Sequence, residues 1–108
     1  MADHTKVDDV IDKVSGLIAA DAYGDAAREV AAFKAAHPGL IFFIEEALPS
    51  RVSDHVLKKT GAHVAFTTYT LRHPNWATEV AKAAADPDAF ARLVSALEAE
   101  LSSKQKAA

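Results

Sequence analysis

The chain has 108 residues, of which half are hydrophobic, a quarter are charged and none is cysteine. This balance predicts a single globular domain over residues 1–108 and excludes a disordered chain, disulfides, thiolate nucleophiles and cysteine-ligated metal sites. The formal net charge is −3, and no segment has the basic excess of a protein that binds the phosphate backbone, so nucleic acid is a disfavoured partner.

Two features of the sequence indicate the cellular compartment in which the protein is expected. Its apolar runs are all shorter than the roughly 18 residues that a membrane span needs, and the N-terminal Met-Ala-Asp-His-Thr-Lys lacks the apolar stretch of a signal peptide. We therefore expect a cytoplasmic protein that has no membrane partner.

Two helices are predicted in the first third of the chain. Residues 5–22 have an apolar stripe at helical spacing, formed by Val7, Val10, Ile11, Val14, Leu17 and Ile18. Gly24 is expected to end this helix and Asp25 to cap the next one, which runs to Ala36. The buried side of the second helix would be formed by Ala26, Val30 and Phe33.

The central third, residues 40–71, contains the two densest apolar runs. Residues 40–44 read Leu-Ile-Phe-Phe-Ile between structure-breaking segments, which is typical of a strand buried on both faces. Residues 62–71 are rich in β-branched and aromatic side chains, which favours a second strand. Residues 50–60 between them have the caps and apolar stripe of a short helix that ends at Gly61.

This order predicts an α/β fold, a small helix-rich domain with one βαβ unit and a right-handed crossover. The apolar residues of both runs also fit helical spacing, with Pro38 at a first helical position. An all-α bundle of five to six helices is therefore the alternative.

Two further helices are predicted after the central unit. Asn75 is a plausible cap for a helix that begins at Trp76 and ends near Ala84. Asp86-Pro87-Asp88 is a strong start signal for a last helix that extends to Leu101. Its apolar stripe consists of Phe90, Leu93, Val94, Leu97 and Leu101. Residues 102–108 have no apolar pattern and are predicted to be a frayed tail.

Residues 42–64 and the helix sequence Asp-Ala-Phe-Ala-Arg-Leu-Val resemble part of the C-terminal lobe of the periplasmic zinc- and manganese-binding proteins of ABC importers. The likeness covers about residues 27–71 and 88–101 and implies a local α/β fold only. Members of that family have two lobes and an export signal, which are not recognisable here. Where the family commonly has an acidic residue after the second strand, this sequence reads Thr68-Tyr69-Thr70-Leu71, so the resemblance implies no metal ligand.

The predicted fold indicates where a ligand would bind. In open α/β units, ligands lie beyond the carboxyl ends of the strands, near the N-terminus of the following helix. The polar residues expected at that edge are Glu45, Glu46, Ser50, Arg51, Arg72 and His73. Adjacent side chains of a strand point to opposite faces, so Glu45 and Glu46 are expected to form ion pairs with Arg51 or Arg72 and not an acid–base couple.

Motifs for cofactors and catalysis are absent from the sequence. The five histidines are not spaced i+3 or i+4 from one another, and there is no His-Glu-x-x-His pattern, so no metal site is predicted. The four glycines are scattered, and no serine lies in a Gly-x-Ser-x-Gly elbow. We therefore predict no cofactor and no catalytic residue, and an enzyme is the less favoured class.

Three hypotheses about function follow. The first is a non-catalytic protein-interaction module that binds itself or another protein, with a homodimer expected because two strands alone make a meagre sheet. The second is a DNA-binding helix-turn-helix formed by residues 50–74, which requires 62–71 to be helical. The third is a small-ligand or enzymatic α/β domain with its site at the strand ends.

Overall fold

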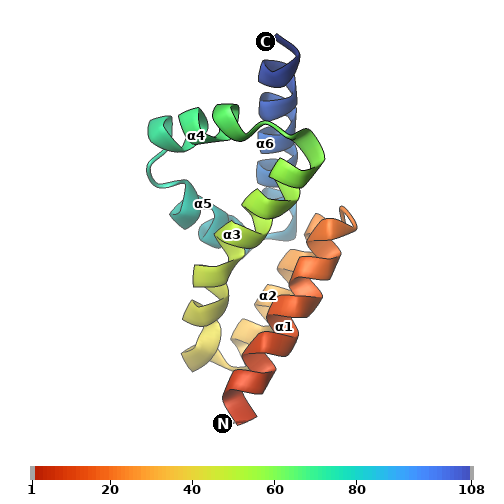
Figure 1. The fold of residues 1–108 in the computed structure, drawn as a ribbon. Helices are drawn as coiled ribbons and strands as arrows, with labels where there is room; N and C mark the ends of the chain where they lie inside the picture. The colour runs from red at the N-terminus through yellow and green to blue at the C-terminus, as the bar shows by residue number, and fades with distance from the viewer. Residues whose placement is uncertain (1, 108) are drawn as a thin grey trace.

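The computed structural model describes residues 2–107, with side chains described for residues 6–103. These residues form α1 (Ala2–Ala19), α2 (Tyr23–Ala36), the 3₁₀ turn η1 (Pro38–Leu40), α3 (Ile41–Thr60), α4 (His63–Arg72), α5 (Trp76–Ala83) and α6 (Pro87–Ala107). The molecule measures 47 × 25 × 23 Å, and the two ends of the chain lie at its opposite ends (Figure 1).

The prediction of an α/β domain with a βαβ unit is wrong. Residues 2–107 contain no strand, and residues 40–71, where both strands were expected, are almost entirely helical. The fold is an all-helical bundle, which corresponds to the alternative of five to six helices.

The first expected strand, residues 40–44, is the end of η1 and the start of α3. Pro38 lies at the first position of η1, where its missing N–H costs nothing, and η1 leads directly into the helix. Helix α3 then continues through Pro49, which the sequence marks as a breaker and which removes one helical hydrogen bond. Burial offsets this cost, because Ile44, Leu48, Val52 and Val56 recur every four residues and are all buried.

The second expected strand, residues 62–71, is almost entirely α4. Its threonines fit a helix because their hydroxyls donate to the helix's own carbonyls: Thr67 to His63, Thr68 to Val64 and Thr70 to Thr67. Phe66 also packs edge-on against Trp76, with ring centroids 5.2 Å apart. Tertiary contact and local hydroxyl bonding thus outweigh the β propensity of this run.

The core lies between four helices, since α1 packs on α2 and α3, while α6 packs on α2 and α3 from the other side (Figure 1). Its largest fully buried side chains are Ile18, Ile44, Leu48, Phe90 and Leu101. Helices α4 and α5 lie at one side of this body, with α5 packed on α3 and α6. Within His63–Arg72, all of which is described, α4 has no buried residue.

The predicted helix signals have mixed outcomes. Asp86 Oδ1 accepts from the Asp88 N–H at 3.0 Å, and α6 begins at Pro87 as predicted. Gly24 does not end the first helix but lies inside α2; the reversal occurs earlier, at Asp21. Helix α6 continues through Ser102 to Ala107, and the described side chains stop at Ser103, so the frayed tail at 102–108 lies partly outside the described residues and stays a prediction.

Candidate functional site

The six residues predicted as a ligand-binding edge do not surround one site. Glu45, Glu46, Ser50 and Arg51 occupy consecutive turns of α3, whereas Arg72 ends α4 and His73 follows it. The strand ends that would have gathered them do not exist within residues 2–107. Whether any of the six binds a ligand stays a prediction.

Two of these residues do contribute to a surface feature. Glu45 and Glu46 line an open groove of about 580 Å³ between the first half of α3 and α5. The groove also contains Phe42, which is 53% exposed, together with Pro49, Ala77, Thr78, Ala81 and Lys82. Its walls are mixed, with acidic, basic and apolar groups, and no ring of convergent polar atoms marks one ligand class.

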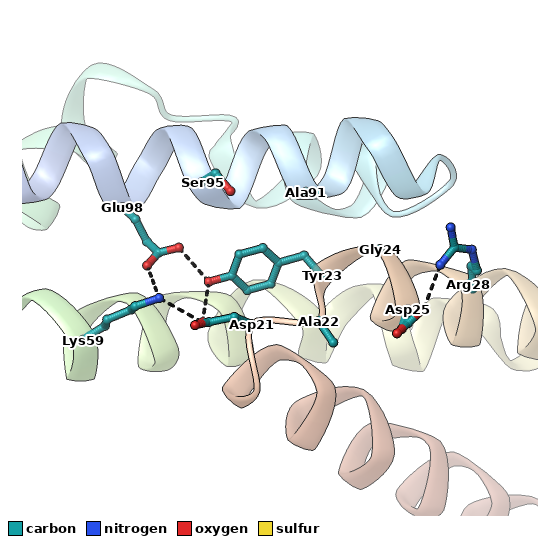
Figure 2. A pocket seen from close by; sticks show the side chains of 10 residues that line it. All are labelled: Asp21, Ala22, Tyr23, Gly24, Asp25, Arg28, Lys59, Ala91, Ser95 and Glu98. Atoms are coloured by element: carbon teal, nitrogen blue, oxygen red, sulfur yellow. Dashed lines mark hydrogen bonds and ion pairs between the residues drawn. The ribbon is translucent and has the colours of Figure 1, made fainter.

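A denser group of polar side chains joins three parts of the fold. Asp21 comes from the α1–α2 turn, Tyr23 from the start of α2, Lys59 from the last turn of α3 and Glu98 from α6 (Figure 2). The fifth member, His55, lies one turn before Lys59 on α3. We call these five residues the polar cluster. The Lys59 ammonium donates to Asp21 Oδ1 at 2.9 Å and lies 2.8 Å from Glu98 Oε1, so one cation bridges two carboxylates.

The Tyr23 hydroxyl is the centre of the polar cluster. It lies 2.6 Å from Glu98 Oε2, 2.9 Å from His55 Nε2 and 3.0 Å from Asp21 Oδ1. His55 Nε2 is also 3.1 Å from Asp21 Oδ1. A phenol has a single proton to donate, so the hydroxyl cannot donate to both carboxylates at once. The polar cluster therefore contains more acceptor contacts than protons available to fill them.

Burial and hydrogen bonding shift the pKa values of the polar cluster. The pKa of the Tyr23 hydroxyl is raised far above its usual range, first by burial and then by the hydrogen bond to Glu98. The pKa of Asp21 is lowered, mainly by the hydrogen bond from Lys59, and the pKa of Lys59 is raised, mainly by Glu98. Tyr23 thus stays a neutral phenol at ordinary pH and is unsuited to act as a base.

The position of Asp21 is unusual for an aspartate. The N–H groups of Asp21 and Ala22 bond to the carbonyls of Ile18 and Leu17 at 3.0 and 2.8 Å, which is the Schellman pattern that ends a helix. Asp21 takes the left-handed position of that motif with φ of 64°, where glycine is the usual residue. A negative charge at a helix C-terminus is also unfavourable against the helix dipole. Local structure therefore disfavours Asp21 twice, and only its side-chain partners favour it.

An open depression of about 550 Å³ lies beside the polar cluster. Asp21, Tyr23, Lys59 and Glu98 form one part of its wall, and Figure 2 shows the ion pair of Asp25 with Arg28 at another part. Because the depression is open, water and small ions have direct access to the carboxylates of the cluster.

The outer face of α4 has a different character. It consists of Val64, Thr67, Thr68 and Leu71, spaced at i, i+3, i+4 and i+7 so that they share one side of the helix. Val64 is 82% exposed and Leu71 is 78% exposed, the two highest values among the large apolar side chains of residues 6–103. The opposite side, with Ala65, Phe66 and Tyr69, packs on the core.

The outer face of α4 is also free of charge. No charged residue occurs from Val64 to Leu71. The hydroxyls of Thr67 and Thr68 are bonded to the carbonyls of their own helix at 3.0 and 3.2 Å. Covering this face would therefore require little loss of hydration at polar groups.

Sequence reasoning missed the polar cluster entirely. Its residues are far apart in the chain, and its single histidine has no second histidine at a ligand spacing. One available signal was Asp21 itself, an acidic residue just after the apolar stripe of a helix, where its charge opposes the helix dipole. A second was the i, i+4 pair of His55 and Lys59, which lie on one side of α3.

Comparison with protein-family models, with curated proteins and with solved structures finds no match. The resemblance to the zinc- and manganese-binding lobes therefore stays a prediction, and the α/β unit that it implied is not formed by residues 2–107. Among the helices of the described chain, none combines the length and the hydrophobicity that crossing a bilayer requires.

Proposed function

We propose that the protein is a non-catalytic interaction module that self-associates through the outer face of α4. The observation that carries this proposal is the exposure of Val64 and Leu71 on a helix whose other side is fixed to the core. Apolar side chains in line at helical spacing are the pattern by which helices pair.

A second copy of the chain is the partner that this face fits best. The chain carries a net charge of −3, so two copies repel weakly overall, but no charged side chain lies between Val64 and Leu71 to oppose pairing there. A twofold arrangement of antiparallel α4 helices places Val64 of one copy opposite Leu71 of the other, with the threonines at the axis. The face is thus complementary to itself.

The expected affinity is low. A stable interface buries about 800 Å² on each partner, and four side chains of a ten-residue helix supply only a fraction of that area. Self-association should therefore be weak and should increase with protein concentration. The interface would bring together uncharged side chains only, the apolar Val64 and Leu71 with the threonines between them.

Sedimentation equilibrium over a wide concentration range tests the proposal. The unmodified chain should show a reversible monomer–dimer equilibrium. Val64→Glu and Leu71→Lys should each shift it to monomer, because each places a charge in an apolar contact. Both positions are exposed, so helical circular dichroism should be unchanged.

A mixing experiment makes the test specific to the antiparallel arrangement. Equal amounts of the Val64→Glu and Leu71→Lys variants should form a heterodimer, because the two new charges face each other across the interface. Phe42→Glu, which alters an exposed apolar side chain outside α4, should leave the equilibrium unchanged. A strict monomer at all concentrations would refute the proposal, and so would loss of association on Phe42→Glu alone.

Comparison of Val64→Glu with a further variant, Arg72→Ala, distinguishes self-association from DNA binding. Residues 50–74 do contain two helices joined at Gly61, as the helix-turn-helix hypothesis requires. The outer face of α4, however, offers no charged side chain for phosphates before Arg72. Fluorescence polarisation that showed salt-dependent binding of duplex DNA, weakened by Arg72→Ala and not by Val64→Glu, would favour the DNA-binding hypothesis instead.

A further inference from the structure

Three ligand atoms of the polar cluster converge on one point of the surface. Asp21, His55 and Glu98 each supply one atom, and these atoms all lie within 4.8 Å of one another. The His55 and Glu98 side chains are only 12% and 16% exposed, so two of the three ligands are held by packed helices. The third, Asp21, is on the solvent side beside the open depression.

The electrostatic balance of the polar cluster favours an added cation. Two carboxylates face one ammonium, and the single proton of the Tyr23 hydroxyl lies between two carboxylate oxygens. Lys59 is the cation that now bridges Asp21 and Glu98, but its side chain is 44% exposed and extends from the end of α3. The ammonium can therefore turn into solvent without any change in the core.

The choice of Asp21 is a separate observation. The turn between α1 and α2 needs a residue with positive φ, which glycine adopts without steric strain and aspartate adopts less readily. Aspartate instead brings a carboxylate to the group formed by His55 and Glu98. Positions that depart from local preferences are often strained or functional sites.

We propose that the polar cluster is a binding site for a divalent transition metal, with Asp21 Oδ1, His55 Nε2 and a carboxylate oxygen of Glu98 as ligands. One imidazole nitrogen and two carboxylate oxygens suit Zn²⁺ and its neighbours, whereas Ca²⁺ and Mg²⁺ prefer oxygen ligands alone. In the metal-bound form the imidazole proton resides on Nδ1, Lys59 turns outward, and water from the depression completes the coordination. The metal would link the α1–α2 turn, α3 and α6.

Isothermal titration calorimetry with Zn²⁺ tests this site. We expect saturable binding of one ion per chain, no binding of Ca²⁺ or Mg²⁺ at the same concentrations, and a higher melting temperature with Zn²⁺. His55→Gln and Glu98→Gln should abolish saturable binding. Asp25→Asn, which alters a carboxylate at the same depression but outside the cluster, should leave binding unchanged.

Lys59→Met gives the opposite prediction. Removing the competing ammonium should tighten Zn²⁺ binding about tenfold or more, because a like charge beside the metal is eliminated. A variant that binds more tightly must be folded, so this result does not depend on whether the ligand variants fold. Co²⁺ should give visible absorption bands of a low-symmetry site, and His55→Gln should remove them. Absence of saturable Zn²⁺ and Co²⁺ binding by the unmodified chain, or binding that survives His55→Gln, would overturn the proposal.

Discussion

The polar cluster and α4 both adjoin the C-terminal end of α3 but are held to the body in different ways. The cluster ties the α1–α2 turn, α3 and α6 together through contacts of 2.6–3.1 Å around one buried tyrosine. Helix α4 begins three residues after Thr60, contacts α6, and packs on the core through the partly buried Ala65, Phe66 and Tyr69. The end of α3 is therefore a fixed support, and α4 projects from it with an apolar face outward.

This difference implies unequal local stability. A segment with few buried apolar contacts opens more readily than one inside the core, and surfaces for binding are often taken from such segments. The cluster and the core beneath it should open only with the whole protein, whereas α4 should open at lower cost. Substitutions in the two regions should therefore change the free energy of unfolding by different amounts.

The largest difference in the free energy of unfolding is expected between alanine variants of two phenylalanines, one on α6 and one on α4. Phe90 on α6 is fully buried, and Phe90→Ala should lower the free energy of unfolding by about 3–5 kcal/mol. Phe66 anchors α4 but is only partly buried, so Phe66→Ala should cost about 1 kcal/mol. Urea unfolding followed by circular dichroism measures both values. Equal losses would mean that α4 is as firmly integrated as α6.

A second difference in the free energy of unfolding is expected between phenylalanine variants of the two tyrosines. Tyr23→Phe removes the hydroxyl that contacts Glu98 and His55 and should lower the free energy of unfolding by about 1–2 kcal/mol. Tyr69→Phe is the matched control on α4, outside the polar cluster, and its effect should stay within about 0.5 kcal/mol. If Tyr23→Phe left the free energy of unfolding unchanged, the hydroxyl at the centre of the polar cluster would add no net stability.

The helices at both ends of the chain could be predicted from sequence, but the centre could not. The stripes that include Val14 and Leu97 have full helical periodicity, and both lie in helices with buried stripes. For residues 62–71 the β-branched content outweighed a weaker helical stripe. The helix is favoured by the contact between Phe66 and Trp76 and by hydrogen bonds from threonine hydroxyls to the backbone. Residue propensities for helix or strand describe neither interaction.

The polar cluster was out of reach for a different reason. Asp21 and His55 are 34 residues apart, and they meet only because α1 and α3 pack together. The predicted site grouped Glu45 and Arg72 because both were expected at strand ends, and those strands are not formed within residues 2–107. A charged residue in a turn that prefers glycine was the strongest local hint.

Alkaline titration gives a third, smaller test. The pKa of Tyr23 is raised mainly by burial, and the pKa of Tyr69 is raised by burial and by the charges of Glu100 and Glu79. A folded-state pKa above the unfolded value of about 10 contributes stability that is present below pH 10 and is lost as the pH rises further. Tyrosinate absorbance should therefore rise late, together with unfolding. An early rise that involves half of the tyrosine signal would show that one ring ionises in the folded protein.

The last contrast is between Asp21 of the polar cluster and Gly61 just before α4, the two residues within 2–107 that have a left-handed backbone. Gly61 precedes α4 with φ of 68° and open space around it, so Gly61→Ala adds backbone strain without a clash and should cost about 1 kcal/mol. Asp21→Gly removes strain at φ of 64° but also removes the contacts to Lys59 and His55, and these changes oppose each other. Its effect on melting temperature should be smaller than that of Gly61→Ala, while Zn²⁺ binding should be lost. If Asp21→Gly were the more destabilising of the two, the carboxylate would be serving the stability of the fold, and its unusual backbone position would need no metal to explain it.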